Sequence, residues 1–309
     1  MAEHTSDADR VVVALGGNAL VEADSSWTYE DQLAVLEETA TELAGLLEAG
    51  TDLVLVHGNG PQVGNRLLEQ EDAETPRLPL DVLVAGTQAE IGYPLGQALE
   101  SAASGATVAT VLTRIVVDPE DSAFEEPTKP VGPFYDEETA ASKPFETRRT
   151  GKGERPYRRV VPSPEPLEVV ERETIGRLLE REDAVICAGG GGVPVSRGDA
   201  LEGVEAVVDK DYTARLLGTE LEADTLLFLT DVEYAYADYG GPDQRPLREV
   251  AVDELRTRLE NDEFAPGSMG PKVRACCQFL ERGGDRAVIT TPGRLEAALA
   301  GETGTRVRP

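Results

Sequence analysis

The stretch Val11-Val12-Val13-Ala14-Leu15-Gly16-Gly17-Asn18 joins an unbroken apolar run to two glycines. Such a run is typical of a strand buried on both faces, and the glycines favour a tight turn at its carboxyl end. A second apolar run, 53–56, ends in the same way, in His57-Gly58-Asn59-Gly60-Pro61. Between the two runs, leucines and an alanine at 33–47 have helical spacing, and Gly50 is a suitable C-terminal stop. This β-α-β order predicts two parallel strands joined by a right-handed crossover.

The same alternation continues along the rest of the chain. Further strands are predicted at 107–112, 184–188, 226–229 and 287–290, and further helices at 252–259, at 271–280 and from about residue 212. Strands that alternate with helices form α/β folds with a parallel sheet. We therefore expect an α/β protein with an open, mostly parallel sheet and helices on both of its faces.

Residues 118–166 interrupt this alternation. The segment is rich in proline, glutamate and arginine and shows little apolar periodicity. It is too long for an ordinary connection, so we expect an inserted lobe or lid. The side chains that we expect to form its packing surface are Val116, Val131, Phe134, Tyr135, Tyr157, Val160 and Val161.

The chain is strongly acidic. Its 309 residues include 58 Asp and Glu but 29 Lys and Arg, a net charge of −29. This balance argues against a nucleic-acid partner, because phosphate backbones require basic surfaces. Acidic residues are spread along the whole chain, which predicts adaptation to high salt, although an ordinary acidic protein is the alternative. At about 1 M salt the Debye length is about 3 Å, so nearby lysines, rather than the global field, would act on an anionic substrate.

The sequence shows no membrane-spanning segment, no signal-peptide pattern and no disulfide framework. No apolar run of membrane-spanning length occurs, and the first ten residues lack the pattern of a signal peptide. We expect a cytoplasmic protein. Cys187, Cys276 and Cys277 do not suggest a disulfide framework, and we expect them to be buried.

Lysine is scarce and unevenly placed. The chain contains five lysines, of which three stand in the least ordinary surroundings: Thr-Lys129-Pro-Val-Gly-Pro-Phe-Tyr, Val-Asp-Lys210-Asp-Tyr and Gly-Ser-Met-Gly-Pro-Lys272-Val. In so acidic a protein, an ammonium kept in such surroundings indicates an anionic ligand. Spreading the charge of a transferring phosphoryl group is work that suits lysine. The aspartates at 209 and 211 are expected to orient Lys210 or to help hold Mg²⁺, and a solvated charge cluster is the alternative.

Three glycine-rich turns follow predicted strands, at Gly16–Asn18, Gly58–Gly60 and Gly189–Gly192. Ligands of open α/β sheets bind outside the carboxyl ends of the strands, where glycine lets backbone N–H groups approach phosphate. One such turn has no special meaning, but three predict an anion site. The spacing matches neither a P-loop nor a dinucleotide fingerprint, so a Rossmann oxidoreductase is only a weak rival.

Two other features stay open at this stage. His57 is either a general base or, as we prefer, a structural hydrogen-bonding group, and metal ligation is disfavoured because no second ligand lies in pattern. Arg158 and Arg159 either bind anions from the inserted lobe or pair with its glutamates.

Together these segments resemble the carbamate kinase family, which has the amino acid kinase fold. The motifs occur in the family's order and cover nearly the whole chain, and 129–135 is the most specific of them. The segments that carry the resemblance are Gly16–Leu20, His57–Gly64, Gln88–Tyr93, Thr113–Asp118, Lys129–Tyr135, Tyr157–Pro164, Gly189–Val195, Val208–Asp211, Leu229–Val232 and Gly267–Val273.

The resemblance implies a three-layer αβα fold with two lobes. Residues 1–185 would form the carbamate lobe, with the inserted subdomain at about 118–166, and residues 186–309 the nucleotide lobe. The implied reaction is ATP + carbamate ⇌ ADP + carbamoyl phosphate, with Mg²⁺ held mainly through the nucleotide phosphates and with Asp211 as a candidate ligand. The family also implies a homodimer and a role in arginine breakdown.

The resemblance also implies roles for individual residues. The expected catalytic residues are Lys129, Lys210, Asp211 and Lys272. The expected substrate and phosphate site comprises Gly16, Gly17, Asn18, Gly58, Asn59 and Gly60. The expected nucleotide site comprises Gly190, Gly191, Asp231, Tyr236, Ser268 and Met269.

Departures at Glu90, at Pro94 and at 21–27 bear on fine substrate preference. The rivals within the same fold are kinases of the acetylglutamate or isopentenyl phosphate type, which the inserted lobe opposes. A non-catalytic nucleotide or metabolite sensor is the rival of another class, and the three motif lysines argue against it.

Overall fold

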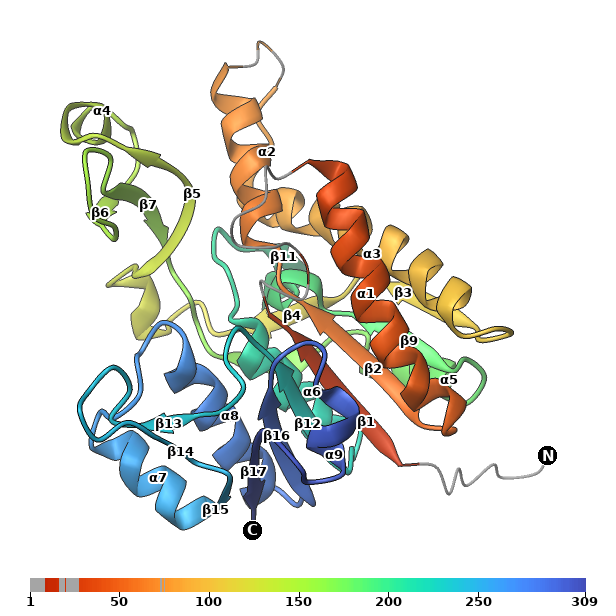
Figure 1. The fold of residues 1–309 in the computed structure, drawn as a ribbon. Coiled ribbons are helices and arrows are strands. Elements are labelled where there is room, and N and C mark those ends of the chain that lie inside the picture. The colour runs from red at the N-terminus through yellow and green to blue at the C-terminus, as the bar shows by residue number, and fades with distance from the viewer. Residues whose placement is uncertain (1–8, 17–19, 21–27, 73, 75) are drawn as a thin grey trace.

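A computed structural model of the chain describes residues 9–16, 20, 28–72, 74 and 76–309. Its centre is an eight-stranded sheet with the order β15-β17-β16-β12-β1-β2-β9-β3 (Figure 1). The strands are β1 Arg10–Leu15, β2 Asp52–His57, β3 Val108–Val111, β9 Ala184–Cys187, β12 Thr225–Leu229, β15 Glu249–Ala251, β16 Arg286–Thr290 and β17 Thr305–Arg308. Every neighbouring pair is parallel except β16 and β17, which confirms the predicted open, mostly parallel sheet.

Helices cover both faces of this sheet (Figure 1). They are α1 Tyr29–Glu48, α2 Gly60–Asp72, α3 Leu80–Ala102, α4 Glu137–Ala141, α5 Arg172–Leu179, α6 Lys210–Glu220, α7 Val252–Glu260, α8 Met269–Glu281 and α9 Leu295–Leu299. The side chains of β1 alternate between two apolar cores. Val11, Val13 and Leu15 pack with α1, α3 and α9, whereas Val12 and Ala14 pack with α5 to α8. The apolar run of β1 is therefore buried on both faces, as a central parallel strand requires.

Helix α1 shows how the sequence sets an element's ends. Thr28 accepts a hydrogen bond from the backbone N–H of Asp31, whose carboxylate accepts one from Thr28 N–H. This capping box satisfies two donors that a helix start leaves unpaired. Gly50, just beyond the helix, has φ +78°, a conformation that glycine adopts without strain. The predicted stop is thereby confirmed.

Three smaller sheets accompany the main one. The sheet β11-β10-β4-β8 consists of Leu201–Gly203, Val193–Arg197, Arg114–Val117 and Pro166–Val169; the pair β13-β14 of Tyr236–Ala237 and Arg245–Pro246; and the sheet β5-β7-β6 of Lys129–Tyr135, Tyr157–Val161 and Thr147–Arg149. Two short 3₁₀ turns, Ser122–Phe124 and Gly189–Gly191, complete the described elements. The proposed lobe boundary after residue 185 falls inside β9, and β10 pairs with β4, so the two-lobe division stays a prediction.

The segment 118–166 contains α4 and the sheet β5-β7-β6 and lies beside the main sheet (Figure 1). Val131 and Val161 are buried and pack with residues of α2 and α3, which seats the base of the lobe on the body. Two members of the predicted packing surface are wrong. Phe134 is 46% exposed beneath the guanidinium of Arg158, because alternation along β5 turns it outward, and Val116 belongs to β4.

Other expectations concern the cysteines and membrane spans. All three cysteines are free and buried, as predicted. Burial raises the pKa of the Cys187 thiol to about 12, so that side chain is an unreactive core residue. Within the described residues, no helix has both the length and the apolar character needed to cross a bilayer.

Candidate active site

The carboxyl ends of β1, β2 and β9 meet at one edge of the sheet. Gly16 N–H, just after β1, donates to Leu229 O at 2.8 Å. A Cβ on Gly16 would lie 2.5 Å from that oxygen, so only glycine permits this approach of two strand ends. Gly17 and Asn18, predicted to bind substrate, lie outside the described residues.

A cavity of about 560 Å³ opens at this edge. We call it the lysine cavity. Among its lining residues, those predicted from the sequence as site residues are Gly58, Asn59, Gly60, Lys129, Gly190, Lys210, Asp211 and Lys272. Residues distant in sequence, from the β2–α2 turn, the inserted lobe, α6 and α8, are thus brought together.

Asp211 binds two of the three predicted lysines. Its carboxylate is 3% exposed; Oδ2 accepts from Lys272 Nζ at 3.0 Å, and Oδ1 pairs with Lys210. Lys272 also donates to Ser268 O at 3.2 Å. Burial lowers the pKa of Lys272, and repulsion from Lys210 adds to this, while Asp211 opposes it. Two ammonium groups sharing one carboxylate leave surplus positive charge, which suits an anionic ligand.

Lys129 reaches this group from the inserted lobe. Its Nζ lies 2.7 Å from Asp209 Oδ2. Asp209 also caps α6, because its Oδ1 accepts from Asp211 N–H at 3.0 Å. Burial alone raises the pKa of Asp209, but the nearby ammonium groups of Lys129 and Lys210 lower it overall, so the carboxylate is ionised. Asp209 was expected to orient Lys210 or to help hold Mg²⁺; its contact with Lys129 was not predicted.

The glycine turn after β9 lies behind the lysine cavity. Ala188, Gly190, Gly191 and Gly192 all have positive φ. A Cβ on Gly190 would lie 2.1 Å from Asn59 Nδ2, and one on Gly191 would lie 2.2 Å from Val208 O. Gly190 and Gly191, predicted for the nucleotide site, therefore lie against Asn59 of the Gly58–Gly60 turn and against the start of α6, respectively. Glycine is required there because the Asn59 side chain and the Val208 backbone both approach the turn closely.

His57 lies beneath this turn. It is 1% exposed, and its Nδ1 donates to Gly58 O at 2.8 Å, since a carbonyl oxygen only accepts. A Cβ on Gly189 would lie 2.4 Å from the ring. Burial lowers the pKa of His57 to about 4, so the ring is neutral at neutral pH. This supports the structural interpretation of His57 over a general base.

The remaining predicted nucleotide residues line a second, smaller cavity of about 90 Å³. Asp231, Tyr236, Ser268 and Met269 all belong to it. Gly267 lines the lysine cavity, and the next residue, Ser268, lines the second one, so the two are contiguous along the chain. Thr230 and Val232 also line it and belong to the segment Leu229–Val232 that carried the resemblance, whereas the residues that the sequence did not indicate are Tyr239, Glu263, Phe264 and Ala265. Their one available signal was the cluster of tyrosines near residue 236.

The two arginines of the inserted lobe are engaged within the protein. Arg158 Nε donates to Gly132 O at 2.9 Å, and Arg159 pairs with Glu205 at 2.5 Å. Glu205 follows β11 and lies outside the inserted lobe, so the pair links the lobe to the body. The pairing alternative is thus supported for Arg159, although its partner is not one of the lobe's own glutamates.

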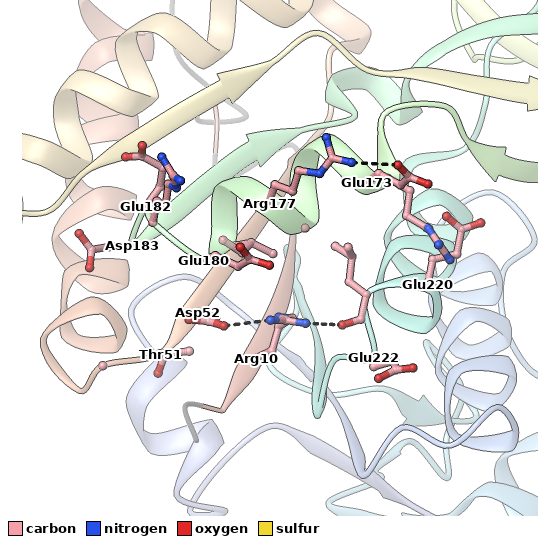
Figure 2. A pocket seen from close by; sticks show the side chains of 16 residues that line it. Arg10, Thr51, Asp52, Glu173, Arg177, Glu180, Glu182, Asp183, Glu220 and Glu222 are labelled. Carbon is pink, nitrogen blue, oxygen red and sulfur yellow. Dashed lines mark hydrogen bonds and ion pairs between the residues drawn. The ribbon is translucent and has the colours of Figure 1, made fainter. Parts of the chain in front are cut away.

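A larger hollow of about 1040 Å³ lies at the opposite end of the sheet, around the start of β1 and β2 (Figure 2). Arg10 pairs there with Asp52 at 3.1 Å, and Arg177 with Glu173 at 3.3 Å. Seven carboxylates and four guanidinium groups line it. The excess of carboxylates disfavours anionic substrates, and none of the predicted site residues lies there. We therefore assign the lysine cavity, not this hollow, as the candidate active site.

Comparisons with known proteins show the family of the chain. The model of the amino acid kinase family matches residues 9–291. A carbamate kinase of Halobacterium salinarum is 49% identical over 302 residues, covering 96% of this chain and 98% of that protein. A carbamate kinase of Pyrococcus furiosus is 46% identical, covering 97% and 99%.

Solved structures give the same result. The carbamate kinase of Giardia lamblia bound to AMP-PNP superimposes with a TM-score of 0.91 at 41% identity, covering 98% of this chain and 99% of that one. The sequence match and the structural match both extend over nearly the full length. The chain therefore belongs to the carbamate kinases of the amino acid kinase family.

Proposed function

We propose that the protein catalyses the reversible reaction of ATP with carbamate to give ADP and carbamoyl phosphate. A carbamate oxygen attacks the γ-phosphorus of ATP, and the bond from that phosphorus to the bridging oxygen of ADP breaks. Carbamate is already an anion, so no proton has to be removed from it. This fits a cavity of glycine and lysine in which the nearby histidine is buried and neutral.

The single observation that carries the proposal is the pairing of Lys210 and Lys272 with one carboxylate, Asp211. The reaction must bring two anions together, and the surplus positive charge lowers that barrier by positioning and charge stabilisation. Lys129 adds a third ammonium from the inserted lobe. We assign Lys210 and Lys272 to the nucleotide phosphates and the transferring group, and Lys129 to carbamate or the transferring phosphoryl group.

The backbone supplies the other half of the proposed phosphate site. Gly58, Asn59 and Gly60 stand at the start of α2, where N–H groups and the helix dipole favour negative charge. Pro61 has no N–H to offer, so the donors come from its neighbours. The adenine nucleotide would enter through the smaller cavity lined by Asp231, Tyr236, Ser268 and Met269; the Giardia relative was solved with AMP-PNP.

The described residues do not provide a complete metal cage. They contain no group of three or more His, Cys, Asp or Glu suited to a metal ion, and both oxygens of Asp211 are engaged by lysines. This fits Mg²⁺ that is carried by the nucleotide phosphates, as Mg²⁺ usually binds in kinases. When bound, Mg²⁺ would neutralise phosphate charge, and Asp209 and Asp211 are the carboxylates that line the lysine cavity. Asp211 could bind Mg²⁺ directly only if one of its carboxylate oxygens lost its ion pair with Lys210 or Lys272.

The partner and the direction of the reaction are further parts of the proposal. We propose a homodimer, because β3 is an edge strand of the main sheet and exposed apolar side chains lie beside it. Tyr93 on α3 is 64% exposed, and Leu112 just after β3 is 51% exposed. In the cell we propose that the enzyme makes ATP from carbamoyl phosphate during arginine breakdown, although the site fits both directions.

A substrate panel tests the proposed reaction. The purified protein is given ATP and Mg²⁺ with carbamate, N-acetylglutamate or isopentenyl phosphate, and ADP formation is followed. We expect ADP with carbamate alone. ADP formed only with another acceptor would assign the chain a sister activity of the same fold, and nucleotide binding without any turnover would favour a sensor.

A further inference from the structure

A buried threonine lies directly behind Asn59, at the edge of the lysine cavity. We propose that Thr87 is a positioning residue that fixes the orientation of the Asn59 amide toward the substrate, with Gly190 as the surface against which that amide rests. The inference rests on the proposed function, because it assigns Asn59 to the carbamate and phosphoryl site.

The hydrogen bonds of the Thr87 hydroxyl determine whether the amino edge or the carbonyl edge of the Asn59 amide can face it. Thr87 belongs to α3 and is 0% exposed. Its hydroxyl donates to Val84 O at 2.7 Å, within the same helix, and receives Asn59 Nδ2 at 2.8 Å. A hydroxyl has one proton, and a carbonyl oxygen only accepts. The Thr87 proton is therefore committed to Val84, and the hydroxyl can offer Asn59 only a lone pair. The amino edge of the amide must face Thr87.

Gly190 holds the same amide from a second direction. A Cβ at this position would lie 2.1 Å from Asn59 Nδ2 and 2.5 Å from Oδ1, so the amide packs closely against the glycine backbone. The glycine turn is itself anchored by two buried threonine hydroxyls. Thr113 Oγ1 accepts from Ala188 N–H at 2.9 Å, and Thr213 Oγ1 donates to Gly191 O at 2.8 Å. Asn59 is thereby held by one edge and one face.

This restraint has a chemical consequence. The two edges of an amide have almost the same shape but opposite polarity, one donating and one accepting. Rotation of the Asn59 amide by half a turn would exchange a donor for an acceptor in a cavity built for anions. It would also place Oδ1 against the Thr87 lone pairs, with the Thr87 proton already used. Thr87 therefore disfavours the wrong orientation, which would cost either its own hydrogen bond to Val84 O or that of the amide, without touching the substrate itself.

Removing the Thr87 hydroxyl tests this role. Thr87→Val keeps the branched shape, and Thr87→Ser keeps the hydroxyl. We expect Thr87→Val to lower kcat/KM for carbamoyl phosphate by about tenfold or more, since small misplacements at a reacting centre have effects of this size. The KM for ADP should stay within about twofold, because neither Asn59 nor Thr87 lines the smaller cavity proposed for the adenine nucleotide, and Thr87→Ser should retain activity.

Thr305→Val is the matched control. Thr305 is also 0% exposed, and its hydroxyl also donates to a carbonyl, that of Leu247, and accepts from a donor, Ala235 N–H. It lies far from the lysine cavity in the β17 strand, so its loss should change stability alone. Should Thr87→Val fail to fold, Thr87→Ala provides a second approach, because it removes the same hydroxyl and places the residue with the highest helix propensity in α3. It should give the same selective loss for carbamoyl phosphate.

A double-mutant cycle separates positioning from a direct role. In an Asn59→Ala background, Thr87→Val should have no further effect on kcat/KM, because nothing is left to orient. An equal loss in both backgrounds, or a folded Thr87→Val enzyme with unchanged kcat/KM, would overturn the inference. If the unmodified protein itself does not turn over carbamoyl phosphate, the proposed function fails instead, so the two failures are distinguishable.

Discussion

Replacement of Lys272 by methionine probes the charge arrangement of the lysine cavity most sharply. Methionine keeps the unbranched stem of the side chain and removes the ammonium. Lys272 is 8% exposed, and its Nζ donates to Asp211 Oδ2 at 3.0 Å and to Ser268 O at 3.2 Å. An ammonium has three N–H donors. Two are used within the protein, so one remains for a phosphate oxygen.

The expected loss follows from that single donor. Removing one preorganised donor from a developing charge costs about 2.7–4 kcal/mol, which is about 10²- to 10³-fold in kcat. The fold should tolerate the change, because Asp211 keeps its pairing with Lys210 and is not left as an unpaired buried carboxylate. We therefore expect an enzyme with a nearly unchanged unfolding midpoint and a kcat lower by about two to three orders of magnitude.

The assay is ATP formation from ADP and carbamoyl phosphate under saturating substrates, alongside urea denaturation. Lys152→Met is the matched control, because Lys152 lies exposed in the inserted lobe and should be dispensable. A folded Lys272→Met enzyme whose kcat equals that of the control would refute the assignment of Lys272 to the phosphoryl group.

Four further outcomes follow from the same structure. Asp211→Asn should lower the free energy of unfolding by about 3–5 kcal/mol, because it leaves two ammonium groups without their carboxylate; chemical denaturation measures this, and a loss below about 1 kcal/mol would contradict the pairing. His57 has its pKa lowered from 6.5 to about 4 in the folded state, so its contribution of about 3 kcal/mol is full above pH 6.5 and is lost as pH falls toward 4. His57→Gln should flatten the pH dependence of unfolding in that window, and an unaltered dependence would refute the burial argument. Gly191→Ala should destabilise the fold and abolish turnover, since its φ is +90° and its Cβ would meet Val208 O; a fully active variant would disprove the close approach. With a net charge of −29, the protein should gain thermal stability from dilute buffer to about 1 M KCl, where screening weakens carboxylate repulsion; a flat Tm would remove the high-salt interpretation.

The sheet was predictable because its strands have a strong local signal. The runs at 11–15 and 53–56 are apolar without interruption, and the structure makes them parallel neighbours at the centre of the sheet. The inserted lobe was predictable from its length and composition. Its internal packing was not, because the register of β5, which turns Phe134 outward, depends on pairing with β7, whose partner residues lie 22 to 32 positions later.

The membership of the site was largely predictable, but its connections were not. Glycine turns at strand ends and scarce lysines indicated the residues of the lysine cavity. No local sequence feature predicted that Asp211 would bind Lys272, which is 61 residues away, or that Asp209 would bind Lys129, which is 80 residues away. The role of Thr87 could not be predicted from the sequence. A threonine inside a helix belongs to no recognisable motif, and its hydrogen-bond partner, Asn59, lies in another segment.

The most direct test of the central claim is ATP synthesis from ADP, Mg²⁺ and carbamoyl phosphate, measured in parallel for the unmodified protein, Lys210→Met, Lys272→Met and Lys152→Met. We predict robust ATP formation by the unmodified protein and Lys152→Met, and a loss of about 10²-fold or more for the two cavity variants. No ATP from folded, unmodified protein, or equal activity in all four, would contradict the account that paired lysines transfer the phosphoryl group.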